Sequence, residues 1–121
     1  KVSGIRAKDC LIYNLSIIFA VPRNKVSKAI GEEGRNVKKL EYILNRKVKI
    51  VALPESIRDA EQFILAIVHP NKFKSLMIDE RQIQINAGQQ NKAILLGRGK
   101  LRLQELREIV KEYLKKDLRI V

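Results

Sequence analysis

Cysteine and histidine are scarce in this sequence. Its 121 residues include one cysteine, Cys10, and one histidine, His69. A single cysteine excludes an internal disulfide, as expected in a reducing compartment, and the separation of Cys10 from His69 gives no ligand spacing typical of a metal site. No apolar run approaches about 18 residues, and no signal-peptide pattern is found, so we expect a cytoplasmic protein.

Aromatic residues are also few, at 5% of the chain, and tryptophan is absent. The six that occur lie in or near apolar stretches: Phe19, Phe63, Phe73, Tyr13, Tyr42 and Tyr113. We interpret the three phenylalanines as core residues rather than stacking platforms. The three tyrosines fall at or near apolar stripes, so we do not expect them to stack on bases. Their positions argue against the mode of RNA recognition in which bases stack on aromatic residues of a sheet.

Acidic residues are also few relative to basic ones. The chain has 13 Asp and Glu against 25 Lys and Arg, which gives a formal net charge of +12 and a pI of about 10.1. A field of this sign favours phosphate polymers or anionic lipid as ligands. The same charge fits a ribosomal protein or a surface that serves solubility. No amphipathic helix with a large exposed apolar face is found, so membrane binding is disfavoured.

The first half of the chain has the pattern of a small α/β unit. Residues 17–21 form a short apolar run closed by Pro22, which predicts a buried strand. The full expected order is a hairpin over residues 11–21 with Asn14 in its turn, a short helix over residues 25–30, an amphipathic helix through Val37, Leu40 and Leu44, and a strand over residues 48–52.

The second half repeats this order behind an additional helix. Ser56 is expected to cap that helix and Pro70 to follow its end. The further elements expected are strands over residues 76–78 and 83–85 joined through a turn at 79–81, a short helix over 90–95, a long helix through 103–114, and a strand over 118–120.

Short sequence similarities support an internal repeat. Lys28-Ala29-Ile30 matches Lys92-Ala93-Ile94, and residues 37–39 match 101–103 at the same distance. Residues 49–51 also match 119–121 in the same order, which predicts a few extra residues in the second long helix. We therefore predict an α+β fold of two compact units, residues 1–53 and 54–121, each with a small mixed three-stranded sheet and helices on one face. A unit of roughly 60 residues buries only about 60% of its unfolded surface, so the two are expected to pack together. The chain begins at Lys1 without a methionine, as a trimmed or processed fragment does.

The segment with the most chemical information joins the two helices of the first unit. It contains two glycines three positions apart, Gly31 and Gly34. Glycine lets the backbone turn sharply and lets a ligand chain approach without a Cβ in the way, and the N-terminus of the following helix suits phosphate. Alone, this spacing is also typical of a plain helix connection. The flanking apolar pattern, the following strand and the second copy favour a functional loop.

Together with its flanks, this loop resembles the signature of K-homology domains. The matching residues run from Ile30 through Gly31 and Gly34 to Val37 and Leu40. The order of elements resembles the type II version of the domain, and the whole chain resembles the archaeal NusA-like transcription factors. Residues 6–10, 17–19 and 29–31 fit that pattern. The first unit lacks the helix that family members carry before the hairpin.

The resemblance implies where a ligand would bind. K-homology units hold about four unpaired nucleotides, with phosphates against the loop and bases in a groove beside it. The residues implied to bind nucleic acid are Ile30, Gly31, Glu32, Glu33, Gly34, Arg35 and Lys38 in the first unit, and Leu95, Leu96, Gly97, Arg98, Gly99, Lys100 and Arg102 in the second.

Both loops depart from the family pattern. Glu32 and Glu33 occupy positions where the family more often has Lys, Arg or small residues, and two carboxylates repel a phosphate. In the second unit the corresponding tetrad is predicted to be Leu95-Leu96-Gly97-Arg98, so both loop glycines are displaced. Phosphate would be bound there by charge and exposed backbone rather than by a GxxG loop.

An enzyme has little support in the residues. The phosphate-loop motif GxxxxGK[ST] is absent. The pairs Glu32-Glu33 and Asp79-Glu80 offer carboxylates to Mg²⁺, but carboxylates on a helix connection and a hairpin turn are more simply solvated. We expect no catalysis, no metal and no cofactor.

The resemblance also implies partners. Single-stranded RNA is the expected ligand, and transcription termination or antitermination with RNA polymerase is the expected setting. If the acidic loop prevents RNA binding, the alternative is a protein-interaction platform on the transcription machinery with little intrinsic RNA affinity. The residues indicate no oligomeric state.

Overall fold

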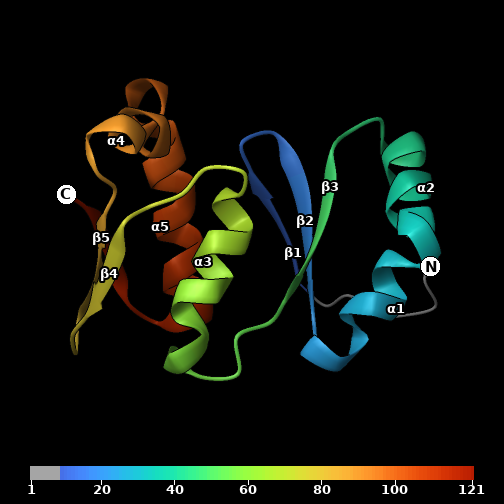
Figure 1. The fold of residues 1–121 in the computed structure, drawn as a ribbon, viewed down its shortest axis with the longest axis horizontal. Coiled ribbons are helices and arrows are strands. Elements are labelled where there is room, and N and C mark those ends of the chain that lie inside the picture. The colour runs from blue at the N-terminus through green and yellow to red at the C-terminus, as the bar shows by residue number, and fades with distance from the viewer. Residues whose placement is uncertain (1–8) are drawn as a thin grey trace. The chain divides into compact units, whose positions relative to one another are not determined.

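The computed structural model describes residues 9–121, and they form two compact units. Unit 1 is Lys1–Leu53 and unit 2 is Pro54–Val121. Each unit has one three-stranded mixed sheet and its own helices, so the predicted α+β class with two small mixed sheets is confirmed (Figure 1). Within residues 9–121, none of the helices has the length and apolar character needed to cross a membrane.

Unit 1 is built on a hairpin followed by two helices and a strand. Strands β1 (Asp9–Tyr13) and β2 (Ser16–Val21) pair antiparallel, and β3 (Val48–Ala52) pairs parallel to β2. Between β2 and β3 the chain forms α1 (Val26–Ile30) and α2 (Arg35–Leu44), which lie on one face of the sheet. A parallel neighbour requires such a crossover, which explains why the loop between α1 and α2 lies beside the sheet.

The tight turn of the first hairpin is set by two residues. Asn14 and Leu15 have φ values of 51° and 65°, and they lie between the paired residues Tyr13 and Ser16. A two-residue hairpin loop with both central φ values positive matches the right-handed twist of the strands, and Asn is among the residues that adopt it most readily. The predicted hairpin with Asn14 in its turn is confirmed.

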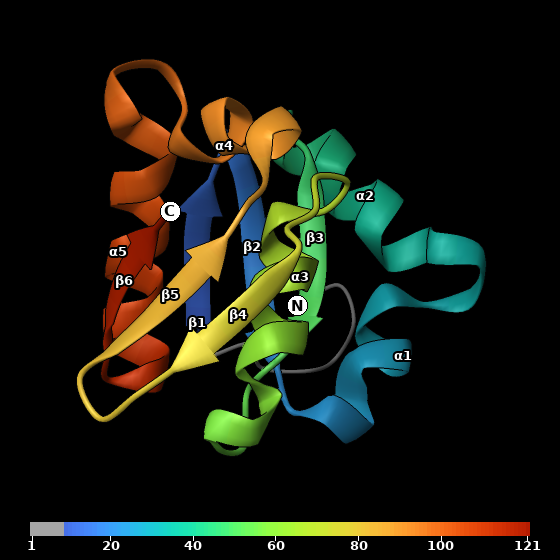
Figure 2. The ribbon, with the colours of Figure 1, turned by 60° about the vertical axis from the view of Figure 1, so that its left-hand side comes forward.

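Unit 2 has the same order of elements with a helix before it. Ser56 caps the 3₁₀ turn Ile57–Asp59 that leads into this helix, because its Oγ accepts a hydrogen bond from the backbone N–H of Arg58 at 3.2 Å. The later elements are α3 (Ala60–Val68), β4 (Ser75–Ile78), β5 (Gln82–Asn86), α4 (Gln89–Leu96), α5 (Leu101–Leu114) and β6 (Asp117–Ile120). Strand β5 lies between antiparallel β4 and parallel β6 (Figure 2).

The turn of the hairpin in unit 2 is stabilised by a carboxylate and contains no glycine. Asp79 Oδ1 accepts hydrogen bonds from the backbone N–H groups of Gln82 and Arg81, each at 2.8 Å. These two bonds, the Gln82 bond first, hold the pKa of Asp79 below its usual value. The Lys116 Nζ donates to the carbonyl oxygens of Asp79 and Glu80, which ties the turn to the strand that follows α5.

The core of unit 2 lies between its sheet and helices α3 and α5. The strand residues Ile83 and Ile85 are fully buried, as are Leu106 and Val110 of α5. The rings of Phe63 and Tyr113 lie 5.5 Å apart, which places α3 beside α5. In unit 1 a smaller cluster joins Val21 to Ala29, Val26 and Ile50.

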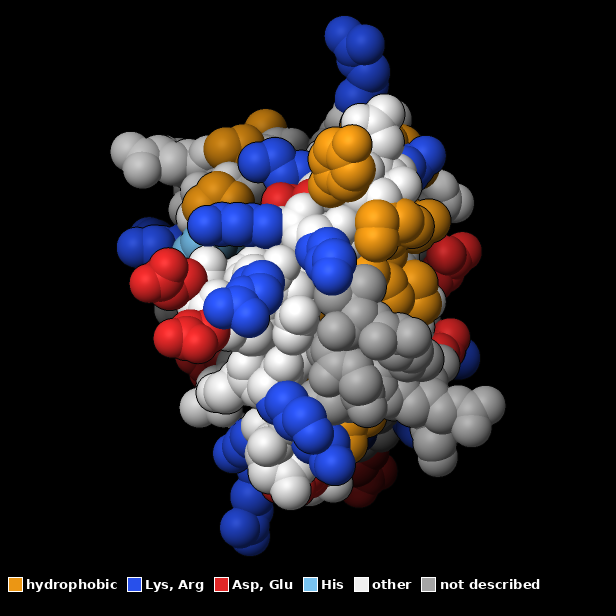
Figure 3. All heavy atoms as spheres, turned by 90° about the vertical axis from the view of Figure 1, so that its right-hand side faces the viewer, with side chains coloured by type: hydrophobic (Ala, Val, Ile, Leu, Met, Phe, Trp, Pro, Cys, Tyr) orange, Lys and Arg blue, Asp and Glu red, His pale blue; other side chains and the backbone are white. Residues whose placement is uncertain are grey.

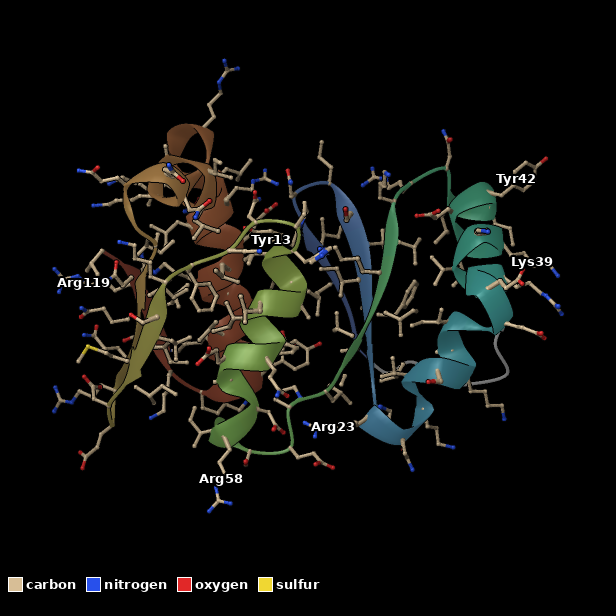
Figure 4. The ribbon with its side chains drawn as sticks, in the orientation of Figure 1. Tyr13, Arg23, Lys39, Tyr42, Arg58 and Arg119 are labelled. Atoms are coloured by element: carbon tan, nitrogen blue, oxygen red, sulfur yellow. The ribbon has the colours of Figure 1, made fainter. Side chains whose placement is uncertain are left out.

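One sequence interpretation of an individual side chain is wrong, and one tyrosine expected at or near an apolar stripe is exposed. Cys10 is exposed rather than a core residue, because β1 is an edge strand of its sheet. Tyr42 is 88% exposed, and its ring points away from α2 (Figure 4). The apolar stripe of α2 runs through Val37, Leu40 and Leu44, and Tyr42 lies off that stripe.

The two units are structural repeats with a constant offset up to the long helix. Helix α1 ends before Gly31 and α4 ends before Gly97, so equivalent positions in the loop and following helix are 66 residues apart. The sequence comparison used an offset of 64, which is wrong because α4 continues two residues beyond the matched tripeptide. Helix α5 has 14 residues and α2 has 10, which confirms the expected extra residues in the second long helix.

The comparison of the two units predicts that the same substitution at equivalent positions lowers the free energy of unfolding by very different amounts. Ile109 is 6% exposed, whereas its counterpart Ile43 is 60% exposed. We expect Ile109→Ala to lower the free energy of unfolding by about 3 kcal/mol, because it leaves a cavity beside a packed helix. Ile43→Ala should cost less than about 1 kcal/mol. Urea unfolding followed by circular dichroism measures both, and equal losses would contradict the assignment of the two faces.

Candidate nucleic-acid interface

The loop between α1 and α2 has a backbone that only glycine adopts easily at its first position. Gly31 has φ 81° and ψ 168°, and it is followed by a single tight turn, Glu32–Gly34. Within that turn Glu33 and Gly34 both have positive φ, at 55° and 75°. The backbone N–H of Gly34 donates to the Gly31 carbonyl oxygen at 3.1 Å and closes the turn.

The loop between α4 and α5 has the same backbone. Gly97 has φ 75° and ψ 171°, followed by the turn Arg98–Lys100 in which Gly99 and Lys100 have φ 62° and 61°. The N–H of Lys100 donates to the Gly97 carbonyl oxygen at 3.1 Å, as in the first loop. The two loops are therefore geometric equivalents.

This geometry corrects the predicted tetrad of the second unit. The loop is Gly97-Arg98-Gly99-Lys100 and not Leu95-Leu96-Gly97-Arg98. Leu95 and Leu96 belong to the last turn of α4, and Leu95 is fully buried, as Ala29 is almost fully buried at the equivalent position of α1. Gly97 is not displaced: it takes the place of Gly31, and Gly99 takes the place of Glu33. Leu95 therefore lies in the core and not on the candidate surface.

The first glycine of each loop is required because the chain passes close to the next helix. A Cβ on Gly31 would lie 2.8 Å from Nδ2 of Asn36, and one on Gly97 would lie 2.8 Å from the backbone nitrogen of Arg102. In unit 1 this contact is fixed by Asn36, whose Nδ2 donates to the carbonyl oxygen of Lys28 at 3.1 Å. Each first glycine thus holds the angle between the two helices.

Charges in the first loop largely cancel. A surface hollow there is lined by two carboxylates and two cations: Glu32, Glu33, Arg35 and Lys38. Arg35 approaches Glu32 at 3.9 Å, and both side chains are mostly exposed, so this ion pair is weak. The predicted residues Gly31, Gly34 and Ile30 flank the hollow along the chain. The structure brings these predicted residues together, but with no net positive charge.

The second loop carries two exposed cations, Arg98 and Lys100, with Leu96 half-buried beside them. The third predicted cation, Arg102, has another role. Its Nη1 lies 3.1 Å from Glu105 Oε1, and both side chains are largely buried, at 14% and 20% exposure. Arg102 is therefore engaged within α5, and Arg98 and Lys100 remain the candidate phosphate contacts.

A groove continues from this loop along unit 2 between α4, α5 and β6. It has a volume of about 480 Å³, within the usual range for ligand sites, and its apolar lining comes from Leu96, Leu103, Leu118 and Ile120. Its cations come from three separate elements and the loop: Lys92, Lys100, Arg107 and Arg119. The single carboxylate, Asp117, lies 3.4 Å from the amine of Lys111.

Lys92, Arg107 and Arg119 were missed as site residues in the sequence interpretation. Each lies at least five residues from the loop along the chain, and only the crossover from β5 through α4 and α5 to β6 brings them together. Arg119 points outward from β6 (Figure 4). The available signal was alternation in β6, where exposed Arg119 lies between buried Leu118 and Ile120.

Unit 1 has no cation at the matching positions of its helices and loop. With the offset of 66, Lys92, Lys100 and Arg107 correspond to Val26, Gly34 and Glu41. Glu41 is used internally, because its Oε2 accepts a hydrogen bond from the backbone N–H of Val48 at 3.0 Å. Three of the four groove cations of unit 2 thus have no cationic counterpart in unit 1; the fourth, Arg119, corresponds to Lys49 of β3.

The carboxylates considered for Mg²⁺ do not converge. Within residues 9–121, no group of three or more His, Cys, Asp and Glu side chains is arranged to hold a metal ion. Of the two pairs considered, Glu32 approaches Arg35, and Asp79 is occupied by its own hairpin turn.

The fold and these loops define a class of protein. It consists of two α+β repeats, and in each repeat a glycine-containing turn connects two helices beside a mixed sheet. Over its whole length the chain is similar in fold to the crystal structure of a protein named APE1850, with a TM-score of 0.68, 21% identity, and coverage of 99% of this chain and 90% of that one. That likeness concerns the fold alone.

A sequence relationship is also found. Over 79 residues the chain is 32% identical to the "Probable transcription termination protein NusA" of Halococcus morrhuae. The match covers 65% of this chain and 55% of the relative, so the chain spans about half the length of that protein. No family model matches the chain. The chain is thus similar to a NusA protein over a partial region.

The loop geometry makes a prediction about its glycines. Gly97→Ala places a Cβ 2.8 Å from the Arg102 backbone at φ 75°, whereas Gly99→Ala has no atom within 4 Å and only the cost of φ 62°. We expect the free energy of unfolding to fall by at least about 2 kcal/mol for Gly97→Ala and by about 1 kcal/mol for Gly99→Ala. Thermal unfolding of the two variants measures the difference. A larger loss for Gly99→Ala would contradict the described loop.

Proposed function

We propose that this chain binds single-stranded RNA without catalysis, mainly through the loop and basic groove of unit 2. The observation that carries the proposal is the continuity between the loop cations Arg98 and Lys100 and the groove cations Lys92, Arg107 and Arg119. Apolar side chains line the same groove, as is needed for unpaired bases but not for a duplex.

The arrangement gives each part of a nucleotide chain a matching surface. The N-terminus of α5 follows the loop directly, so the positive end of its dipole adds to the charge of Arg98 and Lys100. Phosphates would lie at this end. Bases would lie toward the half-buried Leu96 and Leu103, with Lys92 and Arg107 along the edge of the groove. Affinity would come mostly from phosphates, so sequence preference would be modest.

Unit 1 has a smaller role in this proposal. It has the loop backbone, but its hollow contains Glu32 and Glu33, and the positions in its helices and loop that match Lys92, Lys100 and Arg107 lack cations. Arg35 and Lys38 would contact phosphate only weakly while the two carboxylates are charged. Unit 1 would then contribute little to the affinity, which would come from unit 2.

Both units are proposed to be K-homology domains of type II. The order α3-β4-β5-α4-α5-β6, with the sheet order β4-β5-β6, supports this for unit 2. The order β1-β2-α1-α2-β3 supports it for unit 1 without a leading helix among its described residues. The partial similarity to a protein named for transcription termination supports a role in termination or antitermination with RNA polymerase, in the cytoplasm.

The proposal predicts opposite effects for charge changes in the two loops. Arg98→Glu/Lys100→Glu should weaken binding to a short single-stranded RNA at least tenfold, and Glu32→Lys/Glu33→Lys should strengthen it several-fold. Loss of two phosphate contacts should also reduce the slope of log affinity against log salt by about 1.4. Fluorescence anisotropy over several salt concentrations, with duplex RNA as competitor, measures both quantities.

A matched control separates the site from total charge. Arg58→Glu/Arg81→Glu makes the same change in net charge, but these residues lie at the N-terminal end of α3 and in the β4–β5 turn, at the opposite end of unit 2 from the loop (Figures 1 and 4). It should retain most of the affinity. If the control loses as much as the loop variant, or if duplex RNA competes equally, the charge acts generically and the groove is not the site.

A further inference from the structure

A second hollow of unit 2 lies outside the groove, where the segment before β4 meets the turn before α4. Its volume is about 450 Å³, within the usual range for ligand sites. The backbone N–H of Lys74 donates to the carbonyl oxygen of Asn86 at 2.8 Å, which joins the two segments. We call this site the α4 hollow, and its polar and aromatic lining consists of Lys72, Phe73, Lys74, Gln89, Gln90 and Asn91.

The charge of the α4 hollow is positive and is not cancelled nearby. Lys72 and Lys74 are both exposed, and among the described residues those that line the hollow include no Asp or Glu. The sequence on either side is also free of acid, because residues 62–78 and 81–104 contain neither Asp nor Glu. A phosphate there would meet two cations without the repulsion expected at the loop of unit 1.

The remaining lining has the chemistry of a site for an unpaired base. The sequence interpretation placed Phe73 in the core, but its side chain is only half-buried and lines the hollow, whereas Phe63 is 3% exposed. Unpaired bases stack on aromatic rings of this kind. The side-chain amides of Gln89, Gln90 and Asn91 can donate to and accept from base edges. The hollow therefore suits a whole nucleotide better than a bare phosphate.

Helix α4 connects the α4 hollow to the groove. Gln89 lines the hollow, and Lys92 and Leu96 line the groove. These three residues are at positions i, i+3 and i+7, so they lie on one side of α4. One helical turn, about 5 Å, separates Gln89 from Lys92 along the axis. An RNA strand that leaves the groove beside Lys92 thus reaches the hollow within about one nucleotide.

We infer that the α4 hollow is a second nucleotide-binding subsite of unit 2, filled by an RNA strand that continues from the groove along α4. The phosphate would lie against Lys72 and Lys74, and the base would stack on Phe73. This inference rests on the proposed RNA-binding function and lengthens its site, because the loop and groove of such a unit hold about four nucleotides.

The test compares a four-nucleotide and an eight-nucleotide single-stranded RNA by fluorescence anisotropy with the whole chain. Lys72→Gln/Lys74→Gln should weaken binding of the longer RNA at least fivefold and of the shorter RNA less than twofold, because only the longer one fills both the groove and the hollow. For the longer RNA alone, the slope of log affinity against log salt should also fall by about 1.4.

Lys39→Gln/Lys47→Gln is the matched control. It makes the same change in net charge on two exposed lysines of unit 1 that line neither the groove nor the hollow. Lys and Arg side chains are spread over the side of unit 1 that carries α1 and α2, so total charge could act from there as well (Figure 3). This control should change the affinity for either RNA less than twofold.

Stacking is tested separately by Phe73→Trp, because the chain contains no tryptophan of its own. Its fluorescence should be quenched when the eight-nucleotide RNA saturates the protein and much less when the four-nucleotide RNA does. A structural role of Phe73 alone would give no such dependence on RNA length.

Three results would overturn the inference: losses of equal size for the two RNA lengths in the Lys72/Lys74 variant, an equal loss in the Lys39/Lys47 control, or no quenching by the longer RNA. The variant Arg98→Glu/Lys100→Glu separates this failure from that of the proposed function. If it weakens binding of both RNA lengths while the hollow variants have no effect, the hollow alone is rejected. If it leaves both unchanged, the proposed function fails and the inference fails with it.

Discussion

The close approach of the chain at Gly31 and Gly97 is the constraint on which both units depend. At each of these residues the backbone has a large positive φ and passes within contact distance of the helix that follows, against Asn36 in one unit and Arg102 in the other. A side chain at either position would force the two helices apart. In each unit the second helix begins directly after the loop and leads to a strand that pairs parallel to the central strand. The shape of the candidate binding loops is therefore set by backbone sterics and not by their charged side chains.

The repeated scaffold has allowed the two units to diverge in chemistry while their shape is kept. Unit 1 has Glu32 and Glu33 in its loop and Glu41 where unit 2 has Arg107. Unit 2 has four cations and one carboxylate, Asp117, around its groove. Two of its other carboxylates have partners elsewhere, Glu105 with Arg102 and Asp79 in its own hairpin turn. Unit 1 carries more net positive charge in its sequence than unit 2, yet three of its four matching groove positions have no cation, so total charge is a poor guide to where an anion would bind.

Periodicity was sufficient to predict the order of elements, because alternation and helical spacing are local properties of the chain. The strands over residues 17–21 and 48–52 and the cap at Ser56 were predicted on that basis and are confirmed. The position of the loop in unit 2 was predicted two residues too early. The short match at residues 92–94 suggested that the helix ends at Ile94, whereas α4 ends just before Gly97. The residues of the groove could not be found locally either. Lys92, Arg107 and Arg119 are far apart in sequence, and a parallel crossover is what brings them to one surface.

The claim that unit 2 and not unit 1 holds the nucleotide chain is tested most directly by titrating the isotope-labelled protein with a short single-stranded RNA and following its backbone amide resonances. The account predicts saturable shifts concentrated in residues 92–107 and 117–120, with much smaller changes in residues 31–38. Shifts that are largest in residues 31–38, or that are spread over exposed lysines and arginines of both units without saturation, would contradict it.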